Sequence, residues 1–298
     1  MTSVFLIFWA ASAAYVVLTQ KAARLIIYLG VFSLTSFGCF LLLSAPDVAM
    51  AQAVVSVFTT IVYIVALEKF HSLADTPLIK TLLPACFSLL LAALFIWFIP
   101  GEAFNAALKE QYMNFFRLDV GGDNAVTAIY MGYRLYDTLF EALMLLASIM
   151  AVAHLSWHEE MAVTSGKASH ILGSDIAAVT IRTICPVMLL FSVYLVMNGH
   201  LSPGGGFQGG VVAASLFVCR YLVHDLYDIR IERVFTLEKV IFIGIVALSV
   251  LFLFLNAEAY NPAIHGAVYM IMMNLLIGLK VACGFLIVFY RFIALERR

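Results

Sequence analysis

The sequence has 298 residues, of which 64% are hydrophobic and 12% charged, and its mean hydropathy is +1.02. A soluble globular domain is about one quarter charged, so this composition excludes an ordinary soluble protein and indicates a chain that lies in a lipid bilayer. The formal net charge is −1, and no basic and aromatic surface suggests a nucleic-acid partner. The five cysteines are scattered singly, without the paired spacing of a zinc or iron–sulfur site.

Nine apolar runs are long enough to cross a bilayer, which requires about 17 to 25 residues per helix. Lipid offers no partner for backbone polar groups, and the runs are too long for barrel strands. We therefore predict an all-α, polytopic integral membrane protein of about nine transmembrane helices. The predicted spans are 3–20, 25–43, 48–67, 81–99, 125–154, 177–197, 208–224, 237–255 and 265–290.

The distribution of Lys and Arg predicts the orientation, because positively charged loops stay in the cytoplasm. With nine crossings, the external side carries only Lys109 and Arg117, so the N-terminus is expected outside and the C-terminus in the cytoplasm. The first run lacks a basic residue before Phe8 and continues past Ala14, which favours a retained helix over a signal peptide. The cytoplasmic side would carry Lys21, Arg24, Lys69, Lys80, Lys167, Arg220, Arg230, Arg233, Lys239, Arg291, Arg297 and Arg298.

The polar stretches between spans divide the chain into three blocks, and no internal repeat is evident. Residues 1–80 form a three-helix block. Residues 81–165 form a two-helix block with an external segment near 100–123. Residues 166–298 form a four-helix block that holds nearly all the glycine-rich sequence.

The span 125–154 carries three charged residues, Arg134, Asp137 and Glu141, at spacings of three and four. This spacing places them along one stripe of a helix. Charges in the bilayer cost a few kcal/mol or more unless they pair or reach water, so Arg134 and Asp137 are expected to form an ion pair facing protein. Glu141 has no partner in its own helix and is a candidate proton relay or ligand for a hard cation. The alternative is a structural salt-bridge cluster between helices.

Residues 198–210 read Asn-Gly-His-Leu-Ser-Pro-Gly-Gly-Gly-Phe-Gln-Gly-Gly, which is incompatible with a regular helix. We predict that the chain breaks here and restarts as a new helix near Phe207, with backbone groups lining a polar cavity. A histidine changes charge near physiological pH, which suits His200 to a proton path. The alternative is glycine used for close helix packing. The residues of this broken-helix motif that we single out are Ser202, Pro203, Gly204, Gly205, Gly206 and Gln208.

Lys280 lies midway along the last predicted span, too deep for its amine to reach either membrane surface easily. A buried amine that alternates between charged and neutral forms can couple to a neighbouring acid or ion. The alternative is a permanent ion pair, for which Glu141 is a conceivable partner across helices.

Two weaker candidates, Asp47 and Gln52, flank the start of the third predicted span. Asp47 is most simply a helix N-cap. Gln52 and Ser56 lie four residues apart on one helix face, and helix packing explains them better than ion transfer.

The run from Asn198 to Gly210 resembles the signature of the B subunit of Mrp-type Na⁺/H⁺ antiporters, and residues 274–281 look like the last helix of that family. The same element is the F subunit of the related membrane-bound hydrogenases and sulfur-reducing complexes. The resemblance therefore assigns the block from 166 to 298 to that group.

The other two blocks carry further resemblances. The stretch from Asn124 to Ile129, followed by Tyr133 to Glu141, resembles the hydrogenase E subunit and the C-terminal part of the antiporter A subunit, with Phe140 in place of a glycine. Residues 46–55 resemble the hydrogenase D subunit, although Gln52 and Ser56 stand where family members often have an acid. Together the resemblances imply a D–E–F fusion of a sodium-translocating module.

These observations lead to the hypothesis of a non-catalytic membrane subunit that forms part of a Na⁺ or H⁺ path. The resemblance implies a multi-pass protein of the cytoplasmic membrane that works with small Mrp-like subunits and a large antiporter-like, complex I-type subunit. We expect no cofactor and no fixed metal in this chain, while transient Na⁺ binding stays open. Separate blocks without the large subunit favour a redox-driven complex such as a membrane-bound hydrogenase, with a hydrogenase or ferredoxin-oxidising arm as a further partner. The alternatives are a stand-alone Mrp-type antiporter and a purely structural scaffold.

Overall fold

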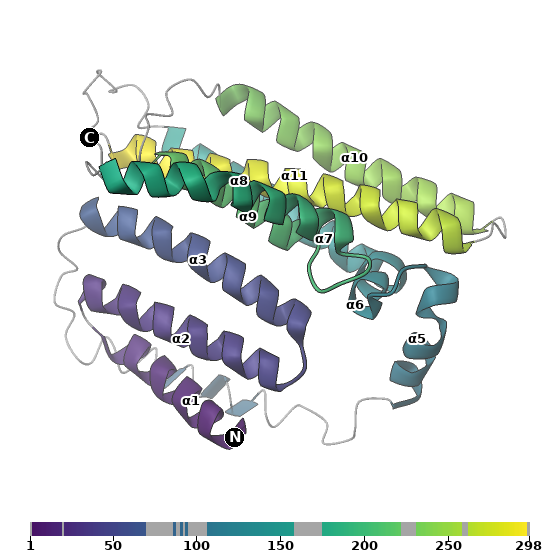
Figure 1. The fold of residues 1–298 in the computed structure, drawn as a ribbon, viewed down its shortest axis with the longest axis horizontal. Helices are drawn as coiled ribbons and strands as arrows, with labels where there is room; N and C mark the ends of the chain where they lie inside the picture. The colour runs from purple at the N-terminus through teal and green to yellow at the C-terminus, as the bar shows by residue number, and fades with distance from the viewer. Residues whose placement is uncertain are drawn as a thin grey trace. The chain divides into compact units, whose positions relative to one another are not determined.

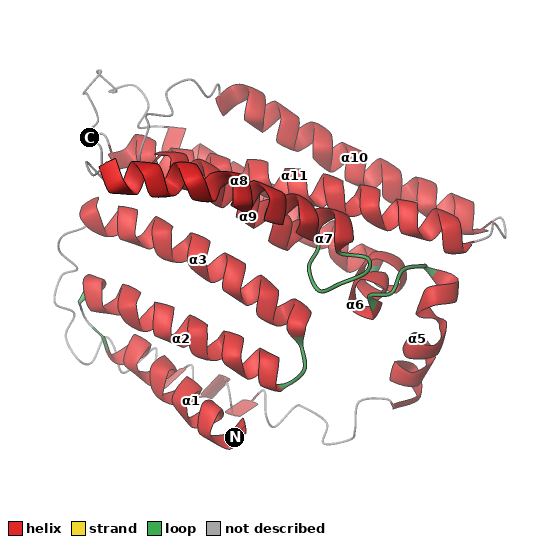
Figure 2. Cartoon of the chain, in the orientation of Figure 1, coloured by secondary structure: helices red, strands yellow, loops and turns green. Residues whose placement is uncertain are grey.

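The computed structural model describes residues 2–19, 21–69, 86–87, 90–91, 93–94, 106–157, 175–221, 231–257 and 262–296. All regular structure within these ranges is helical (Figure 1, Figure 2), which confirms the predicted all-α class. The chain divides into two compact units, Met1–Met113 and Asn114–Arg298. The predicted division into three blocks at 80 and 165 stays a prediction.

The first unit contains a three-helix layer of α1 (Thr2–Leu18), α2 (Ala22–Leu42) and α3 (Pro46–Lys69), in which α2 packs against both neighbours. Side-chain hydrogen bonds tie α1 to α2: Trp9 Nε1 donates to Ser36 Oγ at 2.8 Å, and the hydroxyls of Ser12 and Thr35 lie 3.1 Å apart. In an apolar surrounding such bonds join helices that hydrophobic burial alone does not hold together.

Helix α3 begins at Pro46, the position where a missing N–H costs nothing. Asp47 is therefore inside the first turn, and its prediction as the N-cap is wrong. A carboxylate in the first turn still interacts favourably with the helix dipole.

The second unit contains α7 (Leu135–Trp157), α8 (Asp175–Asn198), α9 (Gly206–Tyr221), α10 (Ile231–Ala257) and α11 (Pro262–Glu296). Helix α11 packs against each of the other four, so it is the central helix of this unit (Figure 1). The segment 100–123, predicted as an external connection, contains the helix α5 (Ala106–Asp119).

Six described helices are long and apolar enough to cross a membrane, within residues 23–42, 46–64, 135–154, 178–198, 231–254 and 266–291. Two further predicted spans correspond to the shorter apolar helices at 4–18 and 206–220. Of the ninth, 81–99, the structure describes only residues 86–87, 90–91 and 93–94. The structure thus supports a multi-pass protein, whereas the count of nine and the orientation of the termini stay predictions.

The span predicted as one helix over 125–154 is interrupted, which corrects the sequence prediction. It consists of α6 (Ala125–Ala128), a π-helical turn η1 (Ile129–Tyr133) and then α7. Arg134, at the junction, leaves helical geometry with φ −114° and ψ 35°. Two carbonyls of the wide turn find side-chain partners: Thr138 Oγ1 donates to Tyr130 O at 2.6 Å, and the Tyr269 hydroxyl donates to Met131 O at 3.1 Å.

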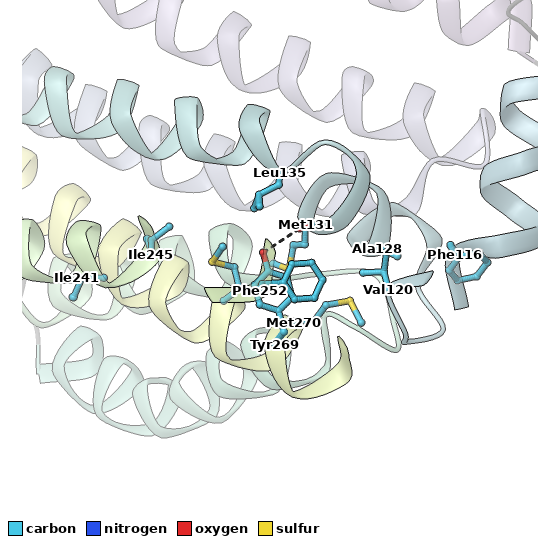
Figure 3. Packing of buried hydrophobic residues seen from close by; sticks show 11 residues of the cluster. Phe116, Val120, Ala128, Met131, Leu135, Ile241, Ile245, Phe252, Tyr269 and Met270 are labelled. Carbon is cyan, nitrogen blue, oxygen red and sulfur yellow. Dashed lines mark hydrogen bonds between the residues drawn. The ribbon is translucent and has the colours of Figure 1, made fainter. Parts of the chain in front are cut away.

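The hydrophobic core of the second unit surrounds this turn (Figure 3). The ring of Phe252 on α10 stacks on that of Tyr269 on α11, with centroids 3.7 Å apart and planes 7° apart. The hydroxyl of the same Tyr269 donates to a backbone carbonyl of η1. One side chain therefore packs in the core and also provides a hydrogen bond to a carbonyl that the irregular turn leaves free. The cluster consists of Phe116, Val120, Ala128, Met131, Leu135, Ile241, Ile245, Phe252, Tyr269, Met270 and Met273.

Helices α9 and α11 approach closely through glycines. A Cβ placed on Gly206 would lie 2.3 Å from Asn274 O, and one on Gly210 would lie 2.5 Å from Gly278 O. Two glycines four residues apart form a stripe that lets the backbones touch. The glycine-packing hypothesis for the 198–210 motif is thus correct for this part of the motif.

We expect Gly210→Ala to destabilise the protein, because the added methyl group would press on the backbone of Gly278. Overpacking of this kind costs about 1–3 kcal/mol. The matched control is Gly244→Ala on α10, where the nearest atoms lie at 3.9 Å and alanine favours the helix by about 1 kcal/mol. Thermal unfolding in detergent should show a lower Tm for the first variant alone. Equal Tm values for both variants would contradict the close packing.

Candidate functional site

The chain breaks between α8 and α9, as the 198–210 motif predicts. Helix α8 ends at Asn198 and α9 begins at Gly206. Gly204 and Gly205 have φ of 144° and 148°, values that side-chain-bearing residues rarely adopt. Gly206 packs on Asn274, which lies eight residues, or about 12 Å, inside the span that starts at residue 266. The loop therefore packs against the interior of a helix that is long and apolar enough to span a membrane.

Two side chains, Asn124 and Thr127, hold this loop in place, and we call this pair the clamp. Asn124 Nδ2 donates to Gly199 O at 3.2 Å and to Ser202 O at 3.1 Å, while Thr127 Oγ1 donates to Gly199 O at 2.6 Å. The backbone N–H groups of Asp123 and Asn124 donate to the carbonyl of His200. Asn124 also caps α6 by accepting from Val126 N at 3.0 Å. Non-helical backbone at membrane depth thus has protein partners.

Asn274 forms a polar node beside the loop. Its side chain is fully buried, and Oδ1 accepts from Gly206 N at 2.9 Å and from the Tyr130 hydroxyl at 3.5 Å. Its Nδ2 has no hydrogen-bond partner among the described residues. The Tyr130 hydroxyl, Gln208 Oε1 and Asn274 Oδ1 lie 2.9, 3.2 and 3.3 Å from the place where a Cβ on Gly205 would stand. Three polar side chains, one each from η1, α9 and α11, therefore converge around Gly205, which has no side chain of its own.

Three further predicted residues of the motif differ in their surroundings. His200 is partly buried, and its Nδ1 atom is buried without a hydrogen-bond partner in the described part of the chain. Ser202 Oγ donates to Asn198 O at 3.3 Å, and Pro203 is exposed. Apart from the ionisable side chain of His200, the motif therefore contributes mainly its backbone conformation.

Lys280 is buried, as predicted, but its ion-pair partner is Glu238 and not Glu141 as the sequence suggested. Its ammonium donates to Glu238 Oε1, and both side chains are only 1% exposed. The ring of Phe242 covers the ammonium at 5.1 Å. The conceived partner Glu141 is an exposed residue of α7, so that suggestion is wrong.

Sequence reasoning missed Glu238 because of a helix boundary. The predicted span 237–255 placed Glu238 at its very start, where an acid is unremarkable. Helix α10 begins at Ile231, so Glu238 lies about two turns inside it. The signal in the sequence is that Glu238, with Lys239, directly precedes a long apolar run on the helix before the one that carries Lys280.

The predicted ion pair between Arg134 and Asp137 is present. Its side chains are 64% and 55% exposed, and Glu141 on the next turn is also exposed. This charged stripe therefore faces away from the second unit's own core, and the expectation that the pair faces protein stays a prediction. It is separate from the buried pair of Lys280 and Glu238.

The weaker candidates lie in the first unit. Gln52 Nε2 donates to Ser33 Oγ at 2.9 Å and to Ser56 Oγ at 3.2 Å, which joins α3 to α2. This supports helix packing as the role of Gln52, as expected from the sequence. Among the described residues, no group of three His, Cys, Asp or Glu side chains is placed to hold a metal ion.

We expect Glu238→Gln and Lys280→Met each to destabilise the protein by about 3–5 kcal/mol, because either change leaves one buried charge without its partner. The double variant should recover most of this loss, since removing both charges is often close to neutral. Thermal unfolding of the wild type, the two single variants and the double variant forms a double-mutant cycle that gives the coupling free energy of the pair. The control is Lys239→Met at an exposed position. Additive losses in the double variant would show that the two side chains do not interact.

Asn124→Asp should loosen the loop while preserving the helix cap, because aspartate caps well but cannot donate to the carbonyls of Gly199 and Ser202. The change removes this donor from the carbonyl of Ser202 and leaves the carbonyl of Gly199 with Thr127 Oγ1 as its side-chain donor. A buried carbonyl that loses its donor costs about 1–3 kcal/mol. Hydrogen–deuterium exchange should be faster across 199–206 than in the control Asn114→Asp on the exposed face of α5. Unchanged exchange in this loop would contradict the clamp.

Two regions of the chain match known protein families. Residues 176–287 match the model described as "Domain related to MnhB subunit of Na+/H+ antiporter", and residues 7–72 match the MbhD model, which describes the D subunit of MBH. The first match spans α8 to α11 and includes the broken-helix loop, Asn274, Glu238 and Lys280. The second spans the three-helix layer α1 to α3.

The curated relatives include subunits of antiporters. A protein of Rhizobium meliloti (strain 1021), described as the probable A/B subunit of a K(+)/H(+) antiporter, is 24% identical over 250 residues, which are 72% of this chain and 25% of that protein. The B subunit of a Na(+)/H(+) antiporter of Alkalihalophilus pseudofirmus is 41% identical over 64 residues, which are 22% of this chain and 44% of that protein. The chain thus covers half or less of these relatives' own lengths.

Two solved structures have the same fold over much of the chain. A chain of the Mrp complex from Dietzia sp. DQ12-45-1b aligns with a TM-score of 0.76 at 21% identity, covering 97% of this chain and 34% of that one. A chain of the membrane-bound sulfane sulfur reductase, described as an archaeal respiratory membrane complex, aligns with a TM-score of 0.57 at 25% identity, covering 71% and 97%. The chain therefore joins an MnhB-like region to an MbhD region in a fold found in an Mrp complex.

Proposed function

We propose that this chain is a non-catalytic membrane subunit that forms part of a monovalent cation or proton path in an Mrp-related complex. The observation that carries the proposal is the fully buried pair of Lys280 and Glu238 in the MnhB-like region. Ionised side chains at the depth of the membrane are costly and mark ion or proton paths. Antiporter subunits among the relatives support the same function.

The broken helix supports the proposal because it brings polar backbone close to this pair. Asn274 and Lys280 lie six residues apart on α11, which corresponds to about 9 Å along the helix axis. The clamp satisfies the loop carbonyls, whereas Asn274 Nδ2 and His200 Nδ1 stay without protein partners among the described residues. Buried polar atoms of this kind are commonly satisfied by ordered water, and water beside a buried charge provides a route for protons.

The exposed stripe of Arg134, Asp137 and Glu141 extends the proposed path to a neighbouring subunit. Charges on a membrane-spanning helix must meet protein or water rather than lipid. We assign this stripe to contact with another membrane subunit, either a small Mrp-like one or the large antiporter-like, complex I-type subunit. Glu141 is the residue of the stripe without an ion-pair partner among the described residues, so it is our candidate for proton or cation transfer across that contact.

The setting of the complex follows from two different resemblances. The MbhD match and the likeness to the membrane-bound sulfane sulfur reductase favour a redox-driven complex related to the membrane-bound hydrogenases. The likeness to the Mrp complex over 97% of the chain favours a stand-alone antiporter. We favour the redox-driven setting in the cytoplasmic membrane, with redox cofactors held by other subunits.

A structural scaffold is the second candidate function, and the closed ion pairs favour it. Lys280 with Glu238 and Arg134 with Asp137 would then only join helices. A scaffold predicts that charge-neutralising variants which assemble normally also transport normally.

Transport by the assembled complex in inverted vesicles separates the two functions. Glu141→Gln and Lys280→Ala should each slow cation/proton exchange about tenfold, equivalent to a barrier about 1.4 kcal/mol higher. The control is Glu232→Gln in the exposed first turn of α10, which should exchange at the normal rate. Native gel electrophoresis must show equal assembly. Normal exchange in both assembled variants would leave the scaffold function standing.

A further inference from the structure

The carboxylate of Glu238 is only half satisfied. Its Oε1 accepts from the ammonium of Lys280, whereas Oε2 is buried and has no hydrogen-bond partner among the described residues. The whole residue is 0% exposed. A charged oxygen without a donor is among the most costly groups to bury, while a neutral hydroxyl costs much less.

The charges that face Glu238 come mainly from α11. The ammonium of Lys280 is in direct contact, and the partly buried thiol of Cys283 lies one turn further on in α11. Arg291 is also buried at the interface of α10 and α11, with its guanidinium 5.8 Å from the ring of Phe235. Phe235 and Phe242 are three and four residues from Glu238, a spacing that places all three on one face of α10.

Other ionisable groups near Glu238 on α10, and those of α7, are exposed. On α10, Glu232, Arg233 and Lys239 are exposed. Helix α7 also packs on α10, and its described ionisable side chains are exposed: Asp137, Glu141 and His154. The charge of the Glu238 carboxylate is therefore governed by Lys280 from within the bundle.

We propose that Glu238 is a proton-binding site within the buried pair. A proton leaves a hydronium ion and forms an O–H bond with Oε2, which releases water and converts the carboxylate into a carboxylic acid. Lys280 keeps its ammonium proton and stays under the ring of Phe242. Departure of the proton to water restores the ion pair.

A proton fits this site better than a metal cation. Hard cations need several oxygen ligands, and no group of acidic, histidine or cysteine side chains suited to a metal is found in the described ranges. The ammonium of Lys280 already occupies Oε1 and repels a second full charge. The proposal rests on the proposed function only for the use made of the proton, because binding itself can be measured without transport.

Infrared difference spectroscopy on the purified full chain, with the subunits that copurify with it, tests the proposal. Acidification should produce the C=O band of a protonated carboxylic acid in the wild type. The band should be absent in Glu238→Gln and retained in Glu141→Gln. Labelling glutamate with ¹³C at the side-chain carboxyl should shift the band in the wild type.

Glu238→Asp provides the second variant, because it retains a carboxylate beside Lys280. Its acid band should persist without a shift on glutamate labelling, since the acid is now an aspartate. A wild-type spectrum without a glutamic acid band, or an unchanged band in Glu238→Gln, would overturn the proposal. The band can behave as expected while Glu141→Gln and Lys280→Ala exchange cations at the normal rate. In that case Glu238 binds a proton, and only the proposed transport function is contradicted.

Discussion

The second unit depends on one constraint: a buried charged or polar group inside a membrane-spanning bundle needs a partner in the protein or in ordered water, because lipid offers none. Helix α11 is where this constraint is met, because it contacts the four other long helices of the unit. It carries Lys280 for the pair with Glu238 and Asn274 for the start of α9. The helices are otherwise apolar, so these few polar contacts define how α9, α10 and α11 fit together.

The same constraint explains why two irregular segments lie next to each other. The loop before α9 and the π-helical turn before α7 both free backbone carbonyls that lipid cannot satisfy. Asn124 and Thr127 bind the carbonyls of the loop, while Thr138 and Tyr269 bind those of the turn. Each irregularity is thus stabilised by side chains from the other segment or from a neighbouring helix, and the polar node at Asn274 forms between them.

Apolar run length predicted the helical class and most of the helix positions, since lipid permits few alternatives. Glycine and proline likewise predicted the break before α9. The π-helical turn was not predictable from such patterns, because Ile129 to Tyr133 is as apolar as a regular helix and the turn is satisfied by Tyr269, more than a hundred residues away. The partner of Lys280 was missed for a local reason, because the polar residues around Glu238 made the start of α10 look like a loop.

The central claim is that buried polar atoms in this unit meet water that can carry protons. Electron cryo-microscopy of the complex in a lipid nanodisc, at a resolution that shows ordered water, tests it most directly. The account predicts water within hydrogen-bond distance of Asn274 Nδ2 and of Glu238 Oε2. Dry contacts of both atoms with apolar side chains would contradict it.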